Sequence, residues 1–242
     1  MKKNALVLAG GGIRGIAHLA FLKILEENKI KIDAISGASA GAIIGAFIAQ
    51  QFKAEEILEI IKKIKFYSPG SFKLGNKGLV KPVFIEKYLK EYLKVDLIEE
   101  LNIPLWVSVT NINTGKPEYL NSGNLSKALL ASSAVPLVFE PVEINGSSYF
   151  DGGISDNFPI LPVLNSYKIL GSSVNSLNPH YEQISYSSLI ERCFHIQLEQ
   201  SLNLKSKNCE VLFNPPNLGD FLMFDFNKLD KIYDYALDYA RK

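Results

Sequence analysis

The chain has 242 residues, of which 47% are hydrophobic and 21% charged, a composition that excludes a disordered chain, a collagen-like repeat and a disulfide scaffold. Its 26 basic and 25 acidic side chains give a formal net charge of +1, so no overall field favours nucleic acid as a partner. Folding should hide about 70% of the unfolded surface, enough for a core without metal or disulfide staples. We expect one α/β domain over residues 1–242.

One lysine-rich segment and two apolar runs bear on whether the protein contacts or crosses a membrane. Between Lys62 and Lys94 there are nine lysines but only two acidic residues, which fits either a solvated helix face or a surface that approaches anionic lipid headgroups. The apolar run 5–9 is too short for a signal peptide. The nineteen uncharged residues 34–52 are long enough to span a membrane, but their glycine-rich start favours a strand, a tight turn and a helix. We expect a cytoplasmic protein, at most peripheral to a membrane.

The first fifty residues predict two strand–helix units. Residues 4–9 are apolar and end in glycines, which indicates a buried strand, and residues 16–28 have helical spacing. A second strand is predicted at 32–36 and a second helix at 40–52. This order predicts a parallel sheet with right-handed crossovers.

The rest of the chain alternates helices and strands. Segment 66–82, rich in glycine, serine, lysine and aromatic residues, is predicted as a loop, either an ordinary surface loop or a mobile flap over the site. We expect a three-layer α/β/α architecture with a mainly parallel central sheet. The further predicted elements are helices at 54–65, 83–94, 126–133, 189–204 and 229–240, strands at 105–112 and 169–175, a hairpin partner at 118–121 and a hairpin at 142–151.

A G-x-S-x-G motif follows the second predicted strand. In Gly37-Ala38-Ser39-Ala40-Gly41, small flanking residues allow a sharp strand-to-helix turn that points the Ser39 hydroxyl out of the sheet. The helix N-terminus behind Ser39 favours negative charge that develops during a reaction. Ser39 is therefore a candidate nucleophile, and the alternative is a tight turn without chemistry.

A glycine-rich loop follows the first predicted strand. Gly10-Gly11-Gly12-Ile13-Arg14-Gly15 fits G-x-G-x-x-G, which either cradles a dinucleotide pyrophosphate or presents backbone N–H groups as an oxyanion hole. Dinucleotide binding needs an acidic residue at the C-terminal end of the second strand, whereas Asp33 lies at its start. The oxyanion hole is favoured, and a nucleotide-binding module through Gly10–Gly15 is the alternative.

Three histidines are candidates for the base that a serine nucleophile needs. His18 lies on the first predicted helix, where a packed histidine is the default. His180 lies in a loop and His195 within a late helix, and neither has a turn motif to present it. With Asp151 either could complete a Ser-His-Asp triad of an esterase or acyltransferase.

Asp151 is the favoured base. It ends a predicted strand and is followed by Gly152 and Gly153, and functional sites gather at the strand ends of a parallel sheet. An ordinary aspartate pKa of ~4 is low for this task, and burial would raise it. The sequence therefore favours a dyad of Ser39 and Asp151.

Together these segments resemble the patatin-like phospholipases. Residues 10–15 are similar to the oxyanion loop of that family, and residues 37–41 to its nucleophile elbow. Residues 151–153, continuing to Asn157 and Pro159, resemble its D-G-[AG]-x-x-x-N-x-P block. Ala131-Ser132-Ser133-Ala134-Val135-Pro136 resembles a segment that the family carries just before that block. The resemblance covers about residues 4–175.

The resemblance implies a lipid acyl hydrolase of the phospholipase A or lysophospholipase type, with no metal or other cofactor and a phospholipid or other acyl-ester lipid as partner. Ser39 would attack the ester carbonyl and Asp151 would take its proton, while the backbone N–H groups of Gly11, Gly12 and Ile13 would hold the oxyanion. Arg14 would either steady the loop or contact phosphate. The residues that support the motifs are Gly10, Arg14, Gly15, Gly37, Gly41, Gly152 and Gly153.

Overall fold

The computed structural model describes residues 2–63, 73–74, 80–81, 83–136, 138–179, 186–223 and 225–242. Most of the predicted flap at 66–82, and also His180, lie outside these residues. Within the flap segment, β3 (Lys73–Leu74) and β4 (Val80–Lys81) pair antiparallel.

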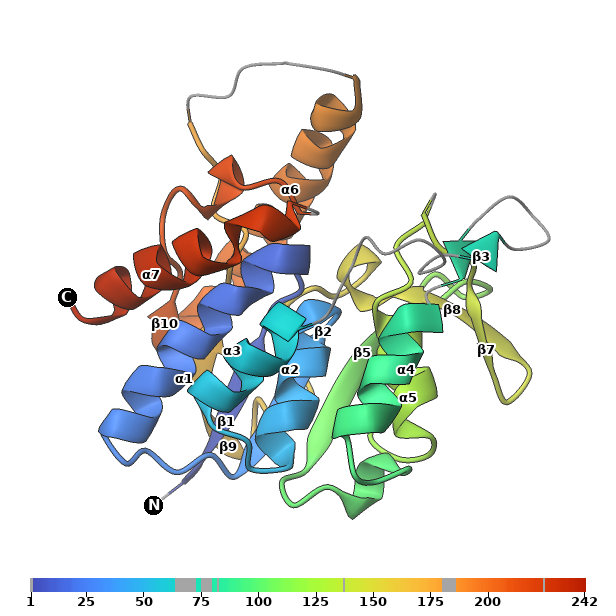
Figure 1. Ribbon diagram of the computed structural model, residues 1–242, viewed down its shortest axis with the longest axis horizontal. Helices are drawn as coiled ribbons and strands as arrows, with labels where there is room; N and C mark the ends of the chain where they lie inside the picture. The colour runs from blue at the N-terminus through green and yellow to red at the C-terminus, as the bar shows by residue number, and fades with distance from the viewer. Residues whose placement is uncertain are drawn as a thin grey trace.

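Eight strands of the described residues form one mixed sheet (Figure 1). Its first five strands are parallel and follow the order β10-β9-β1-β2-β5, and β8 and β7 then add antiparallel pairs. The strands are β1 (Lys3–Leu8), β2 (Ala34–Ala38), β5 (Leu105–Asn111), β6 (Pro117–Leu120), β7 (Val142–Ile144), β8 (Ser147–Asp151), β9 (Tyr167–Ser172) and β10 (Cys209–Phe213).

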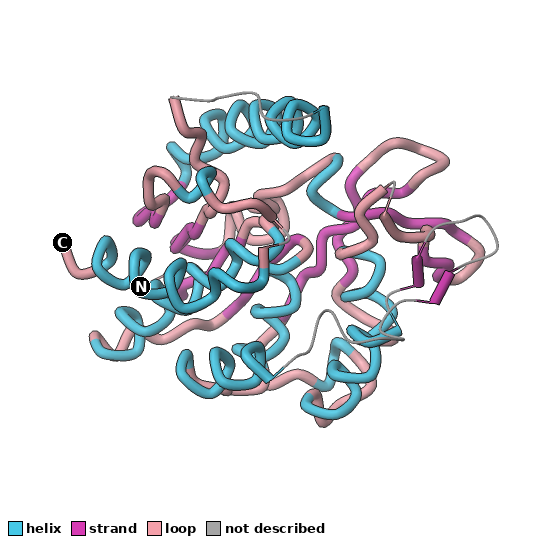
Figure 2. The backbone as a smooth tube through the Cα atoms, turned by 45° about the horizontal axis from the view of Figure 1, so that its top comes forward, coloured by secondary structure: helices cyan, strands magenta, loops and turns pink. Residues whose placement is uncertain are grey.

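The helices lie on both faces of the sheet, so the predicted three-layer α/β/α fold is confirmed. Side chains alternate along β1: Leu6 and Leu8 pack in the larger core with α1, α2, α3, α5 and α7, whereas Ala5 and Val7 pack on the other face with Leu202 of α6. Figure 2 shows the strands between α6 and the other helices. The helices are α1 (Ala17–Glu27), α2 (Ala40–Ala49), α3 (Ala54–Lys63), α4 (Val83–Tyr92), α5 (Leu125–Ser132), α6 (Tyr186–Lys205) and α7 (Leu229–Ala240).

Several strand limits differ from the predicted ones. β2 continues two residues beyond Ser36, because its pairing with β5 runs on to Ala38 opposite Ser108. β9 ends at Ser172, which leaves Asn175 beyond the strand. The edge strand β10 was not predicted, because all of its residues except Phe213 are at least partly exposed and they show no clear alternation. The uncharged stretch 34–52 consists of β2, a turn and α2, and no helix in the described part of the chain is long and apolar enough to cross a membrane.

The register around β5 brings two strand ends together. β2 pairs with residues 105–108, β6 with 107–110 and β8 with 109–111. Since a strand residue has one neighbour on each side, β6 lies on one edge of β5, and β2 and β8 share the other. β2 runs parallel to β5 and ends at Ala38, whereas β8 runs antiparallel and ends at Asp151. The two strand ends therefore meet head to head, opposite neighbouring residues of β5.

Candidate active site

Ser39 lies at the turn between β2 and α2. Its backbone has φ 51° and ψ −125°, a left-handed conformation that is costly for a residue with a side chain. Gly41 allows the first turn of α2 to lie against β1, because a Cβ atom there would be 2.4 Å from the Leu8 carbonyl oxygen. Gly37 lies against the backbone of Gly41 in the same way. The turn therefore has the geometry of a nucleophile elbow, with the N-terminus of α2 behind Ser39.

Asp151 lies at the other strand end and is only 5% exposed. Its carboxylate accepts a hydrogen bond from the Ser39 side chain, and the Gly153 N–H donates to its Oδ1 atom at 2.7 Å. Burial raises the pKa of Asp151 to about 6, and these two hydrogen bonds oppose that rise. The structure thus brings the predicted nucleophile and the predicted base into contact, with a carboxylate more basic than a free aspartate.

Gly10, after β1, is packed against the elbow. A Cβ atom on Gly10 would lie 3.0 Å from Cβ of Ser39. The Gly10 carbonyl accepts hydrogen bonds from the side-chain amides of Asn157, at 3.2 Å, and Asn175, at 2.6 Å. Because C=O and N–H point in opposite directions in a trans peptide, this double contact turns the N–H of Gly11 away from the two amides.

The three expected oxyanion donors differ in their hydrogen bonding. Among the described residues, the N–H groups of Gly11 and Gly12 have no acceptor, so both can donate to a ligand. The N–H of Ile13 instead donates to the Met223 carbonyl at 2.9 Å, and this carbonyl also lies against Gly12. Ile13 could therefore serve an oxyanion only after it has exchanged this hydrogen bond.

His18 is placed in a structural role. Burial lowers its pKa to about 4, which keeps the ring neutral. Nε2 lies 2.8 Å from the Ala9 carbonyl, so it carries the proton, and Nδ1 accepts from the Ser172 hydroxyl at 2.6 Å. His18 thus ties the ends of β1 and β9 together beneath the glycine-rich loop.

His195 contacts Arg14. The buried Arg14 guanidinium lies 2.5 Å from Nε2 of His195, a geometry that fits steadying of the loop. Burial, together with the positive charges of Arg14 and Arg192, lowers the pKa of His195 to about 3. A neutral ring bound to Arg14 is poorly placed to act as the base of a triad.

The remaining motif glycines lie where chain segments touch. Gly15 packs against Ala40 at the start of α2, and Gly152 packs against the Ser108 carbonyl of β5. Gly153 lies against the side chains of Asp151 and Asn157. The three motifs, far apart in the sequence, are therefore in mutual contact.

Two residues at this site were missed by sequence reasoning. The apolar pattern predicts a strand that ends at Asn175, whereas a polar residue after an apolar strand is also a signal for a role at the strand end. Ser132 accepts a hydrogen bond from the Ser39 N–H, and only its motif segment had been noted. Both contacts join residues more than 90 positions apart, which local patterns do not reveal.

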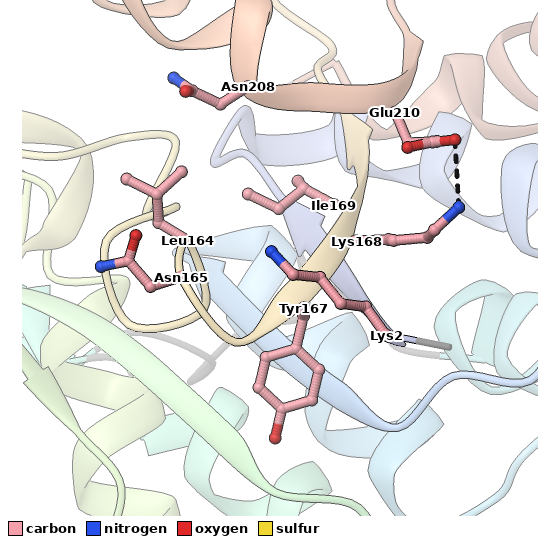
Figure 3. Close-up of a pocket in the computed structure, with 8 residues that line it drawn as sticks. All are labelled: Lys2, Leu164, Asn165, Tyr167, Lys168, Ile169, Asn208 and Glu210. Carbon is pink, nitrogen blue, oxygen red and sulfur yellow. Dashed lines mark hydrogen bonds and ion pairs between the residues drawn. The ribbon is translucent and has the colours of Figure 1, made fainter.

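Other candidate sites in the structure carry less chemistry. Within the described ranges, no three histidine, cysteine, aspartate or glutamate side chains gather in a way that could hold a metal ion. A polar surface pocket of about 420 Å³ lies at the amino ends of β1 and β9, beside the Lys168–Glu210 ion pair (Figure 3). Ser39 and Gly10 follow the carboxyl ends of their strands, so this pocket belongs to the opposite end of the sheet.

Comparisons with known proteins give a family, relatives and a shared fold. The model of the family described as patatin-like phospholipase matches residues 6–164. The lysophospholipase NTE1 of Saccharomyces cerevisiae is 24% identical over 98% of this chain, and that of Neurospora crassa is 26% identical over 100% of it. The chain spans only 16% and 18% of these two relatives.

A solved structure shares the fold. VipD from Legionella pneumophila aligns with 99% of this chain and 66% of its own, with a TM-score of 0.56 and 14% sequence identity. At that identity the likeness concerns the fold alone. It agrees with the mixed α/β sheet described above.

Proposed function

The chain belongs to the patatin-like phospholipase family, and from this membership we propose that it is a serine acyl hydrolase of lipid esters, of the phospholipase A or lysophospholipase type. The resemblance implied this family, and the family match confirms it. The relatives named lysophospholipase support a lipid carrying an acyl ester as substrate. Contact with a membrane surface through the lysines of Lys62–Lys94 stays a prediction.

One observation carries the proposal: the hydrogen bond from the Ser39 side chain to the buried Asp151 carboxylate. In the proposed reaction, Asp151 accepts the hydroxyl proton while Ser39 Oγ forms a bond to the ester carbonyl carbon. The tetrahedral intermediate collapses to an acyl-enzyme, and Asp151 returns the proton to the leaving alcohol. Water then attacks the acyl-enzyme with the same carboxylate as base, and the fatty acid is released.

Acylation and deacylation each pass through a tetrahedral intermediate with a negatively charged oxygen. In the proposed reaction the glycine-rich loop binds this oxyanion in both steps. The N–H groups of Gly11 and Gly12 have no acceptor within the described part of the chain, and the elbow lies against Gly10. Removing one such donor typically raises a barrier by about 3–4 kcal/mol. Ile13 would add a third donor if the Met223 carbonyl moved. The positive end of the α2 dipole adds to this stabilisation.

Labelling by an alkyl fluorophosphonate, read by intact mass, tests the proposal. We expect a single adduct on the wild type, none on Ser39→Ala and a much slower one on Asp151→Asn. His195→Ala should slow labelling less than Asp151→Asn, because the His195 ring contacts Arg14 and is not the proposed base. An adduct that persists in Ser39→Ala, or a wild type that neither labels nor hydrolyses lysophosphatidylcholine, would refute the proposal.

A further inference from the structure

Two groups near the C-terminal end of α5 contact the backbone of both proposed catalytic residues. The Ser39 N–H donates to the Ser132 hydroxyl at 2.8 Å, and the Asp151 N–H donates to the Ala134 carbonyl at 3.0 Å. Resting on the function proposed above, we infer that Ser132 is a positioning residue that sets the place of the nucleophile relative to its base.

The hydrogen bonding of Ser132 has a defined direction. A backbone N–H can only donate and a carbonyl can only accept, so the hydroxyl accepts from Ser39 and donates its own hydrogen to the Ser108 carbonyl, at 2.6 Å. Ser132 is fully buried, so water cannot replace either bond. The hydroxyl therefore links the elbow to β5, the strand on whose edge β2 and β8 meet.

The elbow needs this link because of its conformation. Ser39 has a positive φ, which a residue with a side chain keeps only when its surroundings hold it. Helix α2 holds one side, since the Ser39 carbonyl accepts from the N–H groups of Ala42 and Ile43. Ser132 holds the other side, at the N–H. The two contacts together fix the Cα–Cβ bond that aims the hydroxyl at Asp151.

Asp151 is held from the same short segment. Its N–H bond to the Ala134 carbonyl lies two residues from Ser132, so the spacing of nucleophile and base depends on one end of α5. This gives the Ala131–Pro136 segment a physical role that its position in the sequence does not reveal.

Two matched substitutions isolate the hydroxyl. Ser132→Thr and Ser132→Val add the same volume and differ only in the hydroxyl, so any packing cost is common to both. Ser133→Ala is the neighbouring control, because the buried Ser133 Oγ has no hydrogen-bond partner among the described residues. Turnover of lysophosphatidylcholine, fluorophosphonate labelling and thermal unfolding are measured for each.

We expect kcat and the labelling rate of Ser132→Val to be 10- to 100-fold below those of Ser132→Thr, with KM changed less than threefold. Ser133→Ala should match the wild type. A purely structural role would lower the melting temperature but leave kcat at 20 °C equal in the folded Thr and Val variants, which would overturn the inference. Ser132→Val as active as Ser132→Thr would do the same.

The result separates this inference from the function it rests on. A wild type that labels at Ser39, with equal Thr and Val variants, removes the role of Ser132 and leaves the hydrolase intact. A wild type that shows neither labelling nor turnover removes the proposed function itself. If both position-132 variants unfold, Ser132→Cys, which keeps a weaker donor and acceptor, should still lose at least fivefold in kcat at unchanged KM, and wild-type kcat in that variant would count against the inference.

Discussion

The Asp151 carboxyl shows how one buried residue couples stability to chemistry. Its pKa, raised to about 6 by burial, makes it a better proton acceptor than an exposed aspartate. The same burial penalises its charged form in the folded protein. The hydrogen bonds from Ser39 and Gly153 offset part of that penalty, so the site retains a carboxylate at neutral pH.

The first prediction concerns the pH dependence of activity. Only ionised Asp151 can accept the Ser39 proton, so kcat/KM should rise about tenfold per pH unit below pH 6 and level off above it. Initial rates on a neutral water-dispersed ester between pH 4.5 and 8.5 would measure this rise in kcat/KM. A rise centred near pH 7 that disappears in His195→Ala would instead support a histidine base.

The second prediction concerns stability. Because the folded-state pKa of Asp151 is above its ordinary value of 3.8, the folded protein binds the extra proton, and stability falls as pH rises from about 4 to 6. Asp151→Asn removes this penalty. We expect it to raise the free energy of unfolding by up to about 3 kcal/mol at pH 8 and by little at pH 4. Urea unfolding at both pH values checks this, and a variant less stable than wild type at pH 8 would contradict it.

The third prediction concerns Asn175, which donates to the Gly10 carbonyl. Asn175→Leu keeps the branched shape of the side chain but loses the donor, so the Gly10–Gly11 peptide should be held less firmly. We expect kcat/KM to fall about 10-fold and the affinity for a trifluoromethyl ketone, which forms an oxyanion on Ser39, to fall in parallel.

Ser176→Ala is the matched control for that change. Ser176 is also buried after β9, but its hydroxyl donates to the Pro215 carbonyl and accepts from the Leu218 N–H, so its hydrogen bonds among the described residues lead away from the glycine-rich loop. Its loss should lower stability by about 1 kcal/mol without changing ketone affinity. Equal kinetic losses in both variants would show that Asn175 acts only through stability.

At the scale of elements, the fit of α2 against β1 decides where Ser39 lies. A methyl group at Gly41 would meet the backbone carbonyls of Leu8 and Ala9, which cannot move without disturbing β1. A methyl group at Gly45, one turn later, would meet side-chain methyl groups, those of Ile35 and Leu105 at 3.0 and 3.3 Å and that of Leu8 at 3.8 Å. Helix α2 should therefore tolerate an added methyl group at Gly45 but not at Gly41, in its first turn.

The fourth prediction uses that pair of glycines. Gly41→Ala should destabilise the protein by about 3 kcal/mol and abolish fluorophosphonate labelling, because α2 and the elbow must shift. Gly45→Ala should change the free energy of unfolding by less than about 1 kcal/mol, since added helix propensity offsets the tighter packing. Thermal and urea unfolding, with labelling rates, would compare them. A tolerated Gly41→Ala would show that the elbow does not require this close approach.

Across the whole molecule, a partly buried ion pair joins helix α6 to the site. Lys205 of α6 pairs with the buried Asp156, which also accepts from the Tyr119 hydroxyl of β6 at 2.6 Å. Burial and this hydrogen bond raise the pKa of Tyr119, which keeps it a donor. Asp156 directly precedes Asn157, the residue that contacts Gly10. The cluster thus anchors residues 152–157, which follow Asp151 and contact Gly10 at the end of β1.

The fifth prediction tests this anchor. Lys205→Met leaves Asp156 buried without its cation and should cost about 3 kcal/mol of stability. Lys168→Met removes the exposed pair with Glu210 and should cost less than about 1 kcal/mol. Denaturant unfolding of both variants measures the contrast. Equal costs would mean that the Lys205–Asp156 pair is no more important than a surface ion pair.

Local sequence patterns were enough to predict several strands and the proposed site residues. Short apolar runs next to glycines predict β1 and β2, and the Asn145-Gly146 turn predicts the hairpin of β7 and β8. Ser39 and Asp151 were identifiable because each follows a strand and is flanked by small residues. The partly exposed β10 left no such pattern, and strand limits shifted by two or three residues where pairing, rather than composition, decided them.

The contacts between residues that are distant in the sequence depend on the folded sheet. The contacts of Ser39 with Ser132, of Gly10 with Asn175, and of Ile13 with Met223 join segments between 93 and 210 positions apart. No periodicity or motif encodes these pairings, because they depend on the register of β5 and on which strand ends share its edge. The raised pKa of Asp151 is likewise a consequence of burial by the whole fold. Local sequence patterns indicate the proposed nucleophile and base, and the sheet brings the two side chains together.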